Sequence, residues 1–260
     1  MEGQYSYLDL LMGSNLHTRM LQSKLTPNLA NFTQPMVEEF DIAEKKALPN
    51  VQTAQWKEVE IYASLRTLVA RVSARVFVGA PICRNDTWIN AMIKYTENAT
   101  ITTMILRICP RLIRPAIVRL LPSYWNTKKW VRQGLEILVP EIETRKQNIA
   151  NNPKYERPHD FLQWMMDAAN EDERATDKLA LRELIMGLAS VHTTTMAIAH
   201  VLYDICSMPE YFEILREEMT AVLKEDGGWQ KQTPNKLRKL DSFLKESQRV
   251  SPASLRKCSP

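Results

Sequence analysis

The feature that most constrains this chain is the segment from Leu184 to Tyr203, whose twenty residues include no Asp, Glu, Lys or Arg. Such a segment is long enough to span a bilayer, or to form the central helix of a large core. Its polar side chains cluster near its middle, where a membrane would make them costly. We therefore predict a buried core helix, with the cluster Ser190, His192, Thr193, Thr194 and Thr195 at its centre.

The composition favours helices around one sizeable core. Of the 260 residues, 45% are hydrophobic and only 7 are glycine. Scarce glycine argues against sandwiches and barrels, so the predicted fold class is mainly α, with residues 1–260 forming a single domain. The 34 basic and 30 acidic residues are mixed along the chain. We therefore expect no nucleic-acid partner.

Apolar spacings of three and four predict most of the helices. Pro140 is expected to kink or divide one of them. The capping-box spacing of Ser207 and Glu210 predicts the start of another, and Gly227 and Gly228 its end. The predicted helices lie at about 15–30 (with helical spacing until Pro27), 33–46, 59–78, 87–107, 128–150, 159–169, 184–205, from Ser207 to the glycines at 227–228, and 240–249.

The consecutive threonines predict a local distortion of the long apolar helix. Threonine hydroxyls bond back to the carbonyl four residues earlier and loosen a helix. In a buried helix a distortion opens a groove for a small ligand or an ordered water. His192 and His200 are eight residues apart and cannot hold one metal ion together. Neighbouring Ser, His and Thr in one helix do not form a nucleophile relay either.

A second motif is "ESQR" at 246–249, in which Glu246 and Arg249 stand three apart on one helix face. Side chains at this spacing can interact, but most such pairs are ordinary surface pairs. The spacing alone therefore indicates no function.

Together and in this order, "ASVHTT" at 189–194 and "ESQR" resemble two motifs of the cytochrome P450 family of haem-thiolate monooxygenases. "SARVFVG", "LASVHTTTM" and "KLDSFLKESQRVSP" further resemble fungal secondary-metabolism members of the ent-kaurene oxidase type. The resemblance covers about 15–252. It implies the central helical part of that fold, without the N-terminal β lobe and the C-terminal haem-cysteine loop. We therefore expect a truncated enzyme that is inactive as this chain.

The resemblance also implies roles for single residues. Thr193 matches the threonine that hydrogen-bonds iron-bound oxygen and helps to deliver protons. His192 stands where the family usually has an acid, and a histidine can shuttle protons. Ala189 opens the same motif and is, with Thr193, a candidate contact of the haem. Glu246 and Arg249 match the pair that locks the core beneath it.

Two further regions correspond poorly to the family's motifs. "LHTRMLQSK" does not reproduce the W-x-x-x-R that faces the haem propionates, which leaves His17 and Arg19 as candidates beside the alternative of a solvated basic face. Cys258 is the only late cysteine, but "RKCSP" lacks the glycines of a haem-ligating loop. No metal ligand is therefore predicted, and Cys206 is expected in the core.

For intact relatives the resemblance implies haem b, an NADPH-cytochrome P450 reductase and an apolar small-molecule substrate. We do not expect this chain to retain haem. Intact members lie on the cytosolic face of the endoplasmic reticulum membrane, whereas this chain, without an anchor, is expected to be cytoplasmic or peripheral. Residues 107–125 combine four arginines with Leu, Ile and Pro, which suits either contact with a membrane surface or an ordinary basic linker.

Two alternatives belong to other classes of protein. The first is a non-catalytic helical binding fragment, or a remnant without function. The second is an isoprenoid cyclase, which needs acidic clusters for magnesium. "EDE" at 171–173 matches such a cluster poorly.

Overall fold

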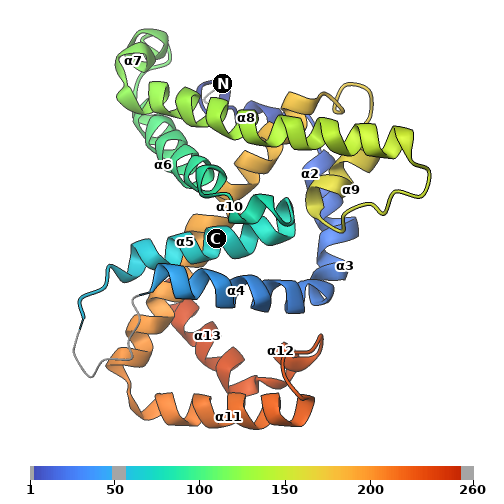
Figure 1. The fold of residues 1–260 in the computed structure, drawn as a ribbon. Coiled ribbons are helices and arrows are strands. Elements are labelled where there is room, and N and C mark those ends of the chain that lie inside the picture. The colour runs from blue at the N-terminus through green and yellow to red at the C-terminus, as the bar shows by residue number, and fades with distance from the viewer. Residues whose placement is uncertain (1–2, 49–56, 253–260) are drawn as a thin grey trace, which may run out of the picture. The chain divides into compact units, whose positions relative to one another are not determined.

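The computed structural model describes residues 3–48 and 57–252 of the chain (Figure 1). These residues form helices and turns without a strand, which confirms the mainly α class. The longer helices are α4 Thr33–Ala47, α5 Ile61–Phe77, α6 Asp86–Ile108, α8 Pro122–Asn151, α10 Thr176–Ser207, α11 Glu210–Asp226 and α13 Arg238–Val250. The shorter elements are η1 Gly3–Tyr5, α1 Asp9–Met12, α2 Leu16–Met20, η2 Leu21–Leu25, α3 Thr26–Asn28, η3 Leu29–Phe32, η4 Ile82–Arg84, α7 Arg114–Leu120, α9 Phe161–Ala168 and α12 Thr233–Lys236.

The chain divides into two compact units, which are described separately. The first unit comprises Met1–Asn28 and Ala70–Ser190, and the second Leu29–Val69 and Val191–Pro260. Helices α5 and α10 contribute residues to both units. One domain over 1–260 stays a prediction.

In the first unit, α10 approaches α6 and α8 closely at two glycines. A Cβ atom on Gly134 of α8 would lie 2.6 Å from Cδ1 of Leu184 on α10. A Cβ atom on Gly187 of α10 would lie 2.3 Å from Cγ of Met92 on α6. Glycine at these positions therefore lets the helices pack at short range.

A buried charge network also lies in the first unit. Arg145 of α8 donates two hydrogen bonds of 2.8 Å to Asp160 and one of 3.2 Å to the Val78 carbonyl. Burial by itself lowers the pKa of Arg145, but the hydrogen bonds and charge of Asp160 outweigh it, so the pKa is raised. Glu183 of α10 is fully buried, and neither of its carboxylate oxygens has a hydrogen bond within residues 3–48 and 57–252. Burial, assisted by the charge of Asp160 and opposed by Arg145, holds the pKa of Glu183 well above its ordinary value.

Several predicted helix boundaries differ from the structure. The predicted helical spacing until Pro27 corresponds to several short elements: α2 continues as the π-helix η2, Pro27 lies within α3, and the 3-10 helix η3 follows. Helix α8 begins at Pro122 rather than near 128, since proline fits the first turn of a helix. Pro140 does not divide α8. Leu138 and Ile142, on either side of the proline, are buried, and their packing holds the helix in the core.

The capping box at the start of α11 was predicted wrongly. The Ser207 hydroxyl donates to the Asp204 carbonyl at 2.9 Å instead of capping α11, and Pro209 is the N-cap residue. This backward bond closes the last turn of α10. At the other end, Gly227 has a φ of 69° and its N–H donates to the Leu223 carbonyl, so the predicted glycine stop of α11 is confirmed.

Helix α10 runs without interruption over 32 residues, and it is long and apolar enough by length and composition to cross a membrane. A helix at the centre of a protein core satisfies the same two conditions. Leu184, Ile185 and Met186 in the first unit and Val191 and Ala199 in the second are buried side chains of this helix.

Candidate functional site

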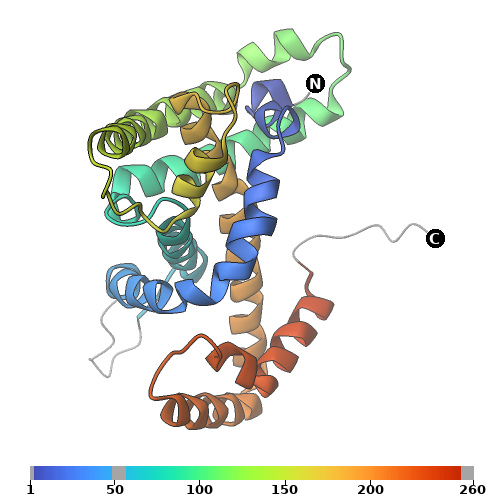
Figure 2. The ribbon, with the colours of Figure 1, turned by 90° about the vertical axis from the view of Figure 1, so that its right-hand side faces the viewer.

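An apolar groove of about 730 Å³ lies between α10 and α13 in the second unit. In both views α11 runs across the space between the ends of these two helices (Figures 1 and 2). Residues of α10 and α13 that recur every four positions share one face of each helix, and these faces form the two walls. The lining residues are Thr193, Thr194, Ala197, Ile198, Val201 and Leu202 from α10, Leu240, Leu244 and Gln248 from α13, and Pro252.

The threonine cluster contributes the hydroxyls at one end of this groove. Thr193 and Thr194 are exposed and line the groove, whereas Thr195 is buried and its hydroxyl donates to the Val191 carbonyl at 2.7 Å. This is the predicted backward hydrogen bond. The prediction that a distorted helix opens the groove is wrong. Helix α10 stays α-helical throughout, and the groove lies between α10 and α13.

The other residues of the motif are placed differently. His192 is half-buried and is not among the residues that line the groove. Ala189 is exposed and belongs to the first unit. Only Thr193 of the three candidates therefore faces the groove, and roles of His192 and Ala189 stay predictions.

Glu246 and Arg249 form a bidentate ion pair on α13. Arg249 Nη2 lies 2.6 Å from Glu246 Oε1, and Arg249 Nε lies 2.7 Å from Oε2. The hydrogen bond between them lowers the pKa of Glu246 and raises the pKa of Arg249. Their side chains are 60% and 71% exposed, so in this chain the pair keeps much of its hydration.

Ser247, inside the same motif, makes the buried contact. Its hydroxyl donates to Asp204 Oδ2 of α10 at 2.5 Å, and the residue is only 5% exposed. The sequence alone did not identify Ser247, or Gln248 of the groove, as a candidate residue. The four-residue spacing of Leu240, Leu244 and Gln248 could have identified their common helix face.

His17 and Arg19, the candidates for contact with haem propionates, lie on α2 in the first unit. Arg19 Nη2 donates to the Ala168 carbonyl at 3.0 Å and lies 3.8 Å from Glu173 Oε2. Burial, together with the charge of Arg182, lowers the pKa of His17. Arg19 thus binds the C-terminal end of α9, which is a structural contact.

The cysteines do not complete the site. Cys206 is exposed, and the prediction that it lies in the core is wrong, because the residue falls in the last turn of α10. Cys258 lies outside the described residues. No cysteine is among the described residues that line the groove.

The geometry defines a class: helical proteins in which a threonine-bearing central helix and an E-x-x-R helix border one apolar groove. The family model for cytochrome P450 matches residues 9–259. The chain therefore belongs to the cytochrome P450 family, as the resemblance predicted.

Two curated relatives of this chain come from fungi. It is 50% identical over 254 residues to cytochrome P450 monooxygenase AN1598 of Emericella nidulans, covering 97% of this chain and 47% of that protein. It is 42% identical over 253 residues to ent-kaurene oxidase P450-4 of Gibberella fujikuroi, covering 97% of this chain and 49% of that protein. The chain spans about half the length of the curated relatives it matches.

A solved structure shares the fold. The retinoic acid-bound cyanobacterial CYP120A1 superposes with a TM-score of 0.61 at 19% identity, over 91% of this chain and 49% of that one. At this identity the similarity shows the fold alone. It agrees with the prediction that the chain forms the central helical part of the family's fold.

Membership of the family implies haem, and the groove fits one part of a haem site. The apolar side chains of α10 and α13 suit the flat, apolar face of a porphyrin, and Thr193 and Thr194 add hydroxyl groups. The thiolate ligand of a haem-thiolate centre is not supplied by the described lining residues. The described part of the groove therefore fits the apolar face of such a site, and no iron ligand is among its described lining residues.

Proposed function

We propose that this chain supplies the central helices of a monooxygenase that inserts an oxygen atom from O2 into a terpenoid-like apolar small molecule. Haem, when bound, supplies the oxygen chemistry, with electrons from an NADPH-dependent reductase. The observation that carries this proposal is the position of Thr193 at the end of an apolar groove between the helices that bear the family's two motifs.

In this proposal the described residues perform two tasks. The apolar faces of α10 and α13 exclude water and accommodate apolar atoms. The Thr193 hydroxyl holds a proton at Oγ1 at the end of the groove, where the proton can be donated to a reacting oxygen. His192 is a second candidate for moving this proton, and Glu246 and Arg249 for holding α13.

We further propose that the 260-residue chain alone does not form a thiolate-ligated haem. The reduced protein treated with carbon monoxide should show no absorption band typical of thiolate-ligated haem. A band in purified material would contradict this proposal. Such a band would also show that a cysteine outside the described residues acts as the ligand.

The catalytic proposal is tested on the longest product of the gene. Transcripts are sequenced across the codon for Pro260, and if the frame continues into a glycine-rich cysteine loop, that longer protein is expressed with its reductase. Thr193→Ala should then lower product formed per NADPH by about tenfold or more, while peroxide release rises. Thr194→Ala is the matched control because the two threonines line the same groove. Equal product yields from the parent and Thr193→Ala would refute the role of Thr193.

The connector 107–125 supports a proposed contact with a membrane surface. Ile108, Leu112 and Leu120 are 88%, 95% and 81% exposed, and Arg107, Arg111 and Arg119 are exposed among them. Within the first unit, α7 projects beyond the ends of α6 and α8 in both views (Figures 1 and 2). Exposed apolar side chains flanked by arginines suit an anionic lipid surface. We propose peripheral attachment to the cytosolic face of the endoplasmic reticulum through this segment.

A non-catalytic binding fragment is the second candidate function. A further apolar groove of about 620 Å³ lies between the end of α10, α11 and α13, and Tyr211, Ile214, Phe243 and Val250 are among its lining residues. A stable, haem-free monomer after purification supports this candidate. Aggregation supports a remnant whose apolar surface is uncovered.

A further inference from the structure

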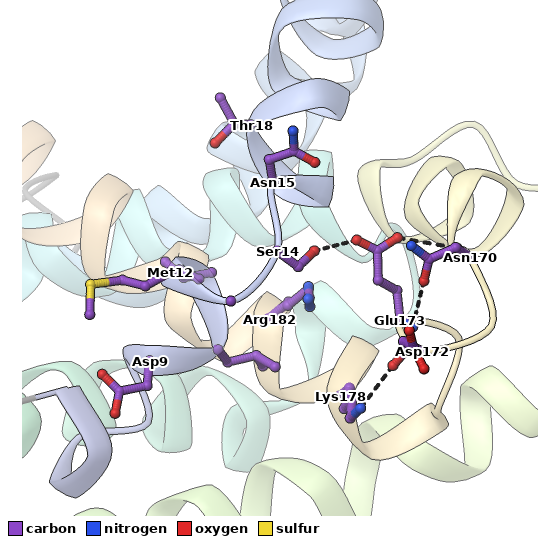
Figure 3. Close-up of a pocket in the computed structure, with 13 residues that line it drawn as sticks. Asp9, Met12, Ser14, Asn15, Thr18, Asn170, Asp172, Glu173, Lys178 and Arg182 are labelled. Atoms are coloured by element: carbon purple, nitrogen blue, oxygen red, sulfur yellow. Dashed lines mark hydrogen bonds between the residues drawn. The ribbon is translucent and has the colours of Figure 1, made fainter. Parts of the chain in front are cut away.

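A polar pocket of about 680 Å³ lies within the first unit (Figure 3). One side is the loop that precedes α2, including Ser14, and the other is the turn that carries Glu173 together with the start of α10. Its lining is rich in polar and charged side chains. It therefore does not suit the apolar substrate of the proposed function, and the inference drawn from it is independent of that function.

Arg182 of α10 lines this pocket, and the burial and hydrogen bonding of its guanidinium are unusual. The residue is only 1% exposed, and its Nε and Nη1 atoms are buried without a hydrogen-bond partner among the described residues. Burial lowers the pKa of Arg182, while the charge of Glu173 opposes this effect. Buried arginines in folded proteins are normally paired with an acceptor. Nε and Nη1 of this guanidinium are thus buried donors without an acceptor in the part of the chain that the structure describes.

Glu173 acts on Arg182 through its charge, but it accepts no hydrogen bond from Nε or Nη1 of Arg182. It accepts hydrogen bonds from the Ser14 hydroxyl and from the Asn170 backbone N–H, the latter at 3.1 Å, and Arg19 lies 3.8 Å away (Figure 3). The carboxylates that line the pocket belong to Asp9, Asp172 and Glu173, and the cations to Lys178 and Arg182.

Other charged groups at the pocket are placed differently. Lys178, one turn before Arg182 on α10, donates to the Asp172 carbonyl at 2.8 Å and adds a second cation on the same helix face. The Asp172 residue is exposed, and the Asp9 carboxylate points away from Arg182 (Figure 3). An anion would therefore be attracted by the unpaired Nε and Nη1 atoms of Arg182 and not by the net charge of the pocket.

We propose that this pocket binds a small oxyanion, a carboxylate or phosphate group, through the guanidinium of Arg182. A planar guanidinium donates parallel hydrogen bonds to either group, and a buried position strengthens them. The bound anion would supply the acceptor that Arg182 lacks.

The test is isothermal titration calorimetry of the purified 260-residue chain with sodium phosphate and, separately, with sodium acetate. Sodium chloride keeps the ionic strength constant, so that screening does not differ between samples. Saturable binding of one or both anions is expected, and the stronger one identifies the chemical source. The absence of saturable binding of either anion would overturn the proposal.

Variants locate the anion. Arg182→Met should weaken binding by about tenfold or more, whereas the same substitution at the surface residue Arg157 should leave it unchanged. If circular dichroism shows that Arg182→Met is unfolded, Arg182→Lys is used instead. Lysine retains the positive charge but not the planar pair of N–H donors, so this variant should bind the anion severalfold more weakly than the parent. Glu173→Gln removes the neighbouring negative charge and should bind more tightly. Binding by folded Arg182 variants at the affinity of the parent would place the anion elsewhere and refute the site.

Discussion

Ser247 of α13 donates a 2.5 Å hydrogen bond to Asp204 near the C-terminal end of α10, and this bond joins the two helices that form the groove. Ser247 stands between Glu246 and Arg249, whose ion pair faces solvent. The motif thus has two faces in this chain. The buried face holds α13 against α10, and the exposed face presents an ordered pair of charges.

Ser247→Ala should lower the free energy of unfolding by about 1–2 kcal/mol, because it leaves a half-buried carboxylate without its hydrogen-bond donor. Urea denaturation followed by circular dichroism measures the change. The matched control is Ser242→Ala on the same helix, where the serine is exposed, and its effect should stay within about 0.5 kcal/mol. Equal effects of the two substitutions would show that the contact with Asp204 does not stabilise the unit.

Gly187→Ala should lower the free energy of unfolding by about 1–3 kcal/mol, because the new methyl group overlaps the side chain of Met92. Gly13→Ala is the control, since a Cβ atom there would lie at an ordinary 3.5 Å from the Asp9 carbonyl oxygen. In a double-mutant cycle, Met92→Ala should relieve part of the penalty of Gly187→Ala. Strictly additive effects would argue against a direct clash.

Arg145→Met should destabilise the chain by about 3–5 kcal/mol, because it leaves the Asp160 carboxylate buried without its partner. The comparison is Arg157→Met, which breaks the exposed pair with Asp167 and should change stability by about 0–1 kcal/mol. Chemical denaturation of both variants provides the measurement. Similar losses from the two would contradict the different burial of these pairs.

Glu183 makes the stability of the first unit depend on pH. Its pKa is raised in the folded state, mainly by burial, so the folded protein retains a proton that the unfolded chain loses above the ordinary pKa of glutamate. The unfolded state then binds fewer protons, and stability falls as pH rises from about 4 toward the folded pKa. Glu183→Gln, which cannot ionise, should reduce this slope. Unfolding curves from pH 4 to pH 9 measure it, and parallel profiles for parent and variant would show that Glu183 does not retain a proton in the folded protein.

The sequence predicted the helices well and the neighbours of each helix poorly. Periodicity is a local property, so it located α4, α6 and α13 and the face that Leu240 and Leu244 share. It could not show that α10 lies opposite that face, because the contact joins residues about fifty positions apart. Family resemblance, not periodicity, connected these two segments.

The sequence also did not predict which charged side chains are buried. Glu183 directly precedes the uncharged segment and reads as its charged boundary. It is nevertheless fully buried, and the charged residues that act on it, Arg145 of α8 and Asp160, are both distant from it in sequence. Ser207 shows the converse, because a local capping pattern lost to a competing hydrogen bond with Asp204.

The proposed membrane contact of the connector gives a final prediction. Co-sedimentation of the chain with anionic phospholipid vesicles should exceed that with neutral vesicles and should fall as salt is added, because arginines of 107–125 would face the lipid headgroups. Leu112→Asp and Leu120→Asp should each weaken binding by about tenfold, since each removes a leucine side chain that would insert below the headgroups. Met12→Asp, at an exposed apolar position elsewhere in the first unit, is the control and should have no effect. Binding that survives both leucine substitutions at the strength of the parent would identify the segment as an ordinary basic linker.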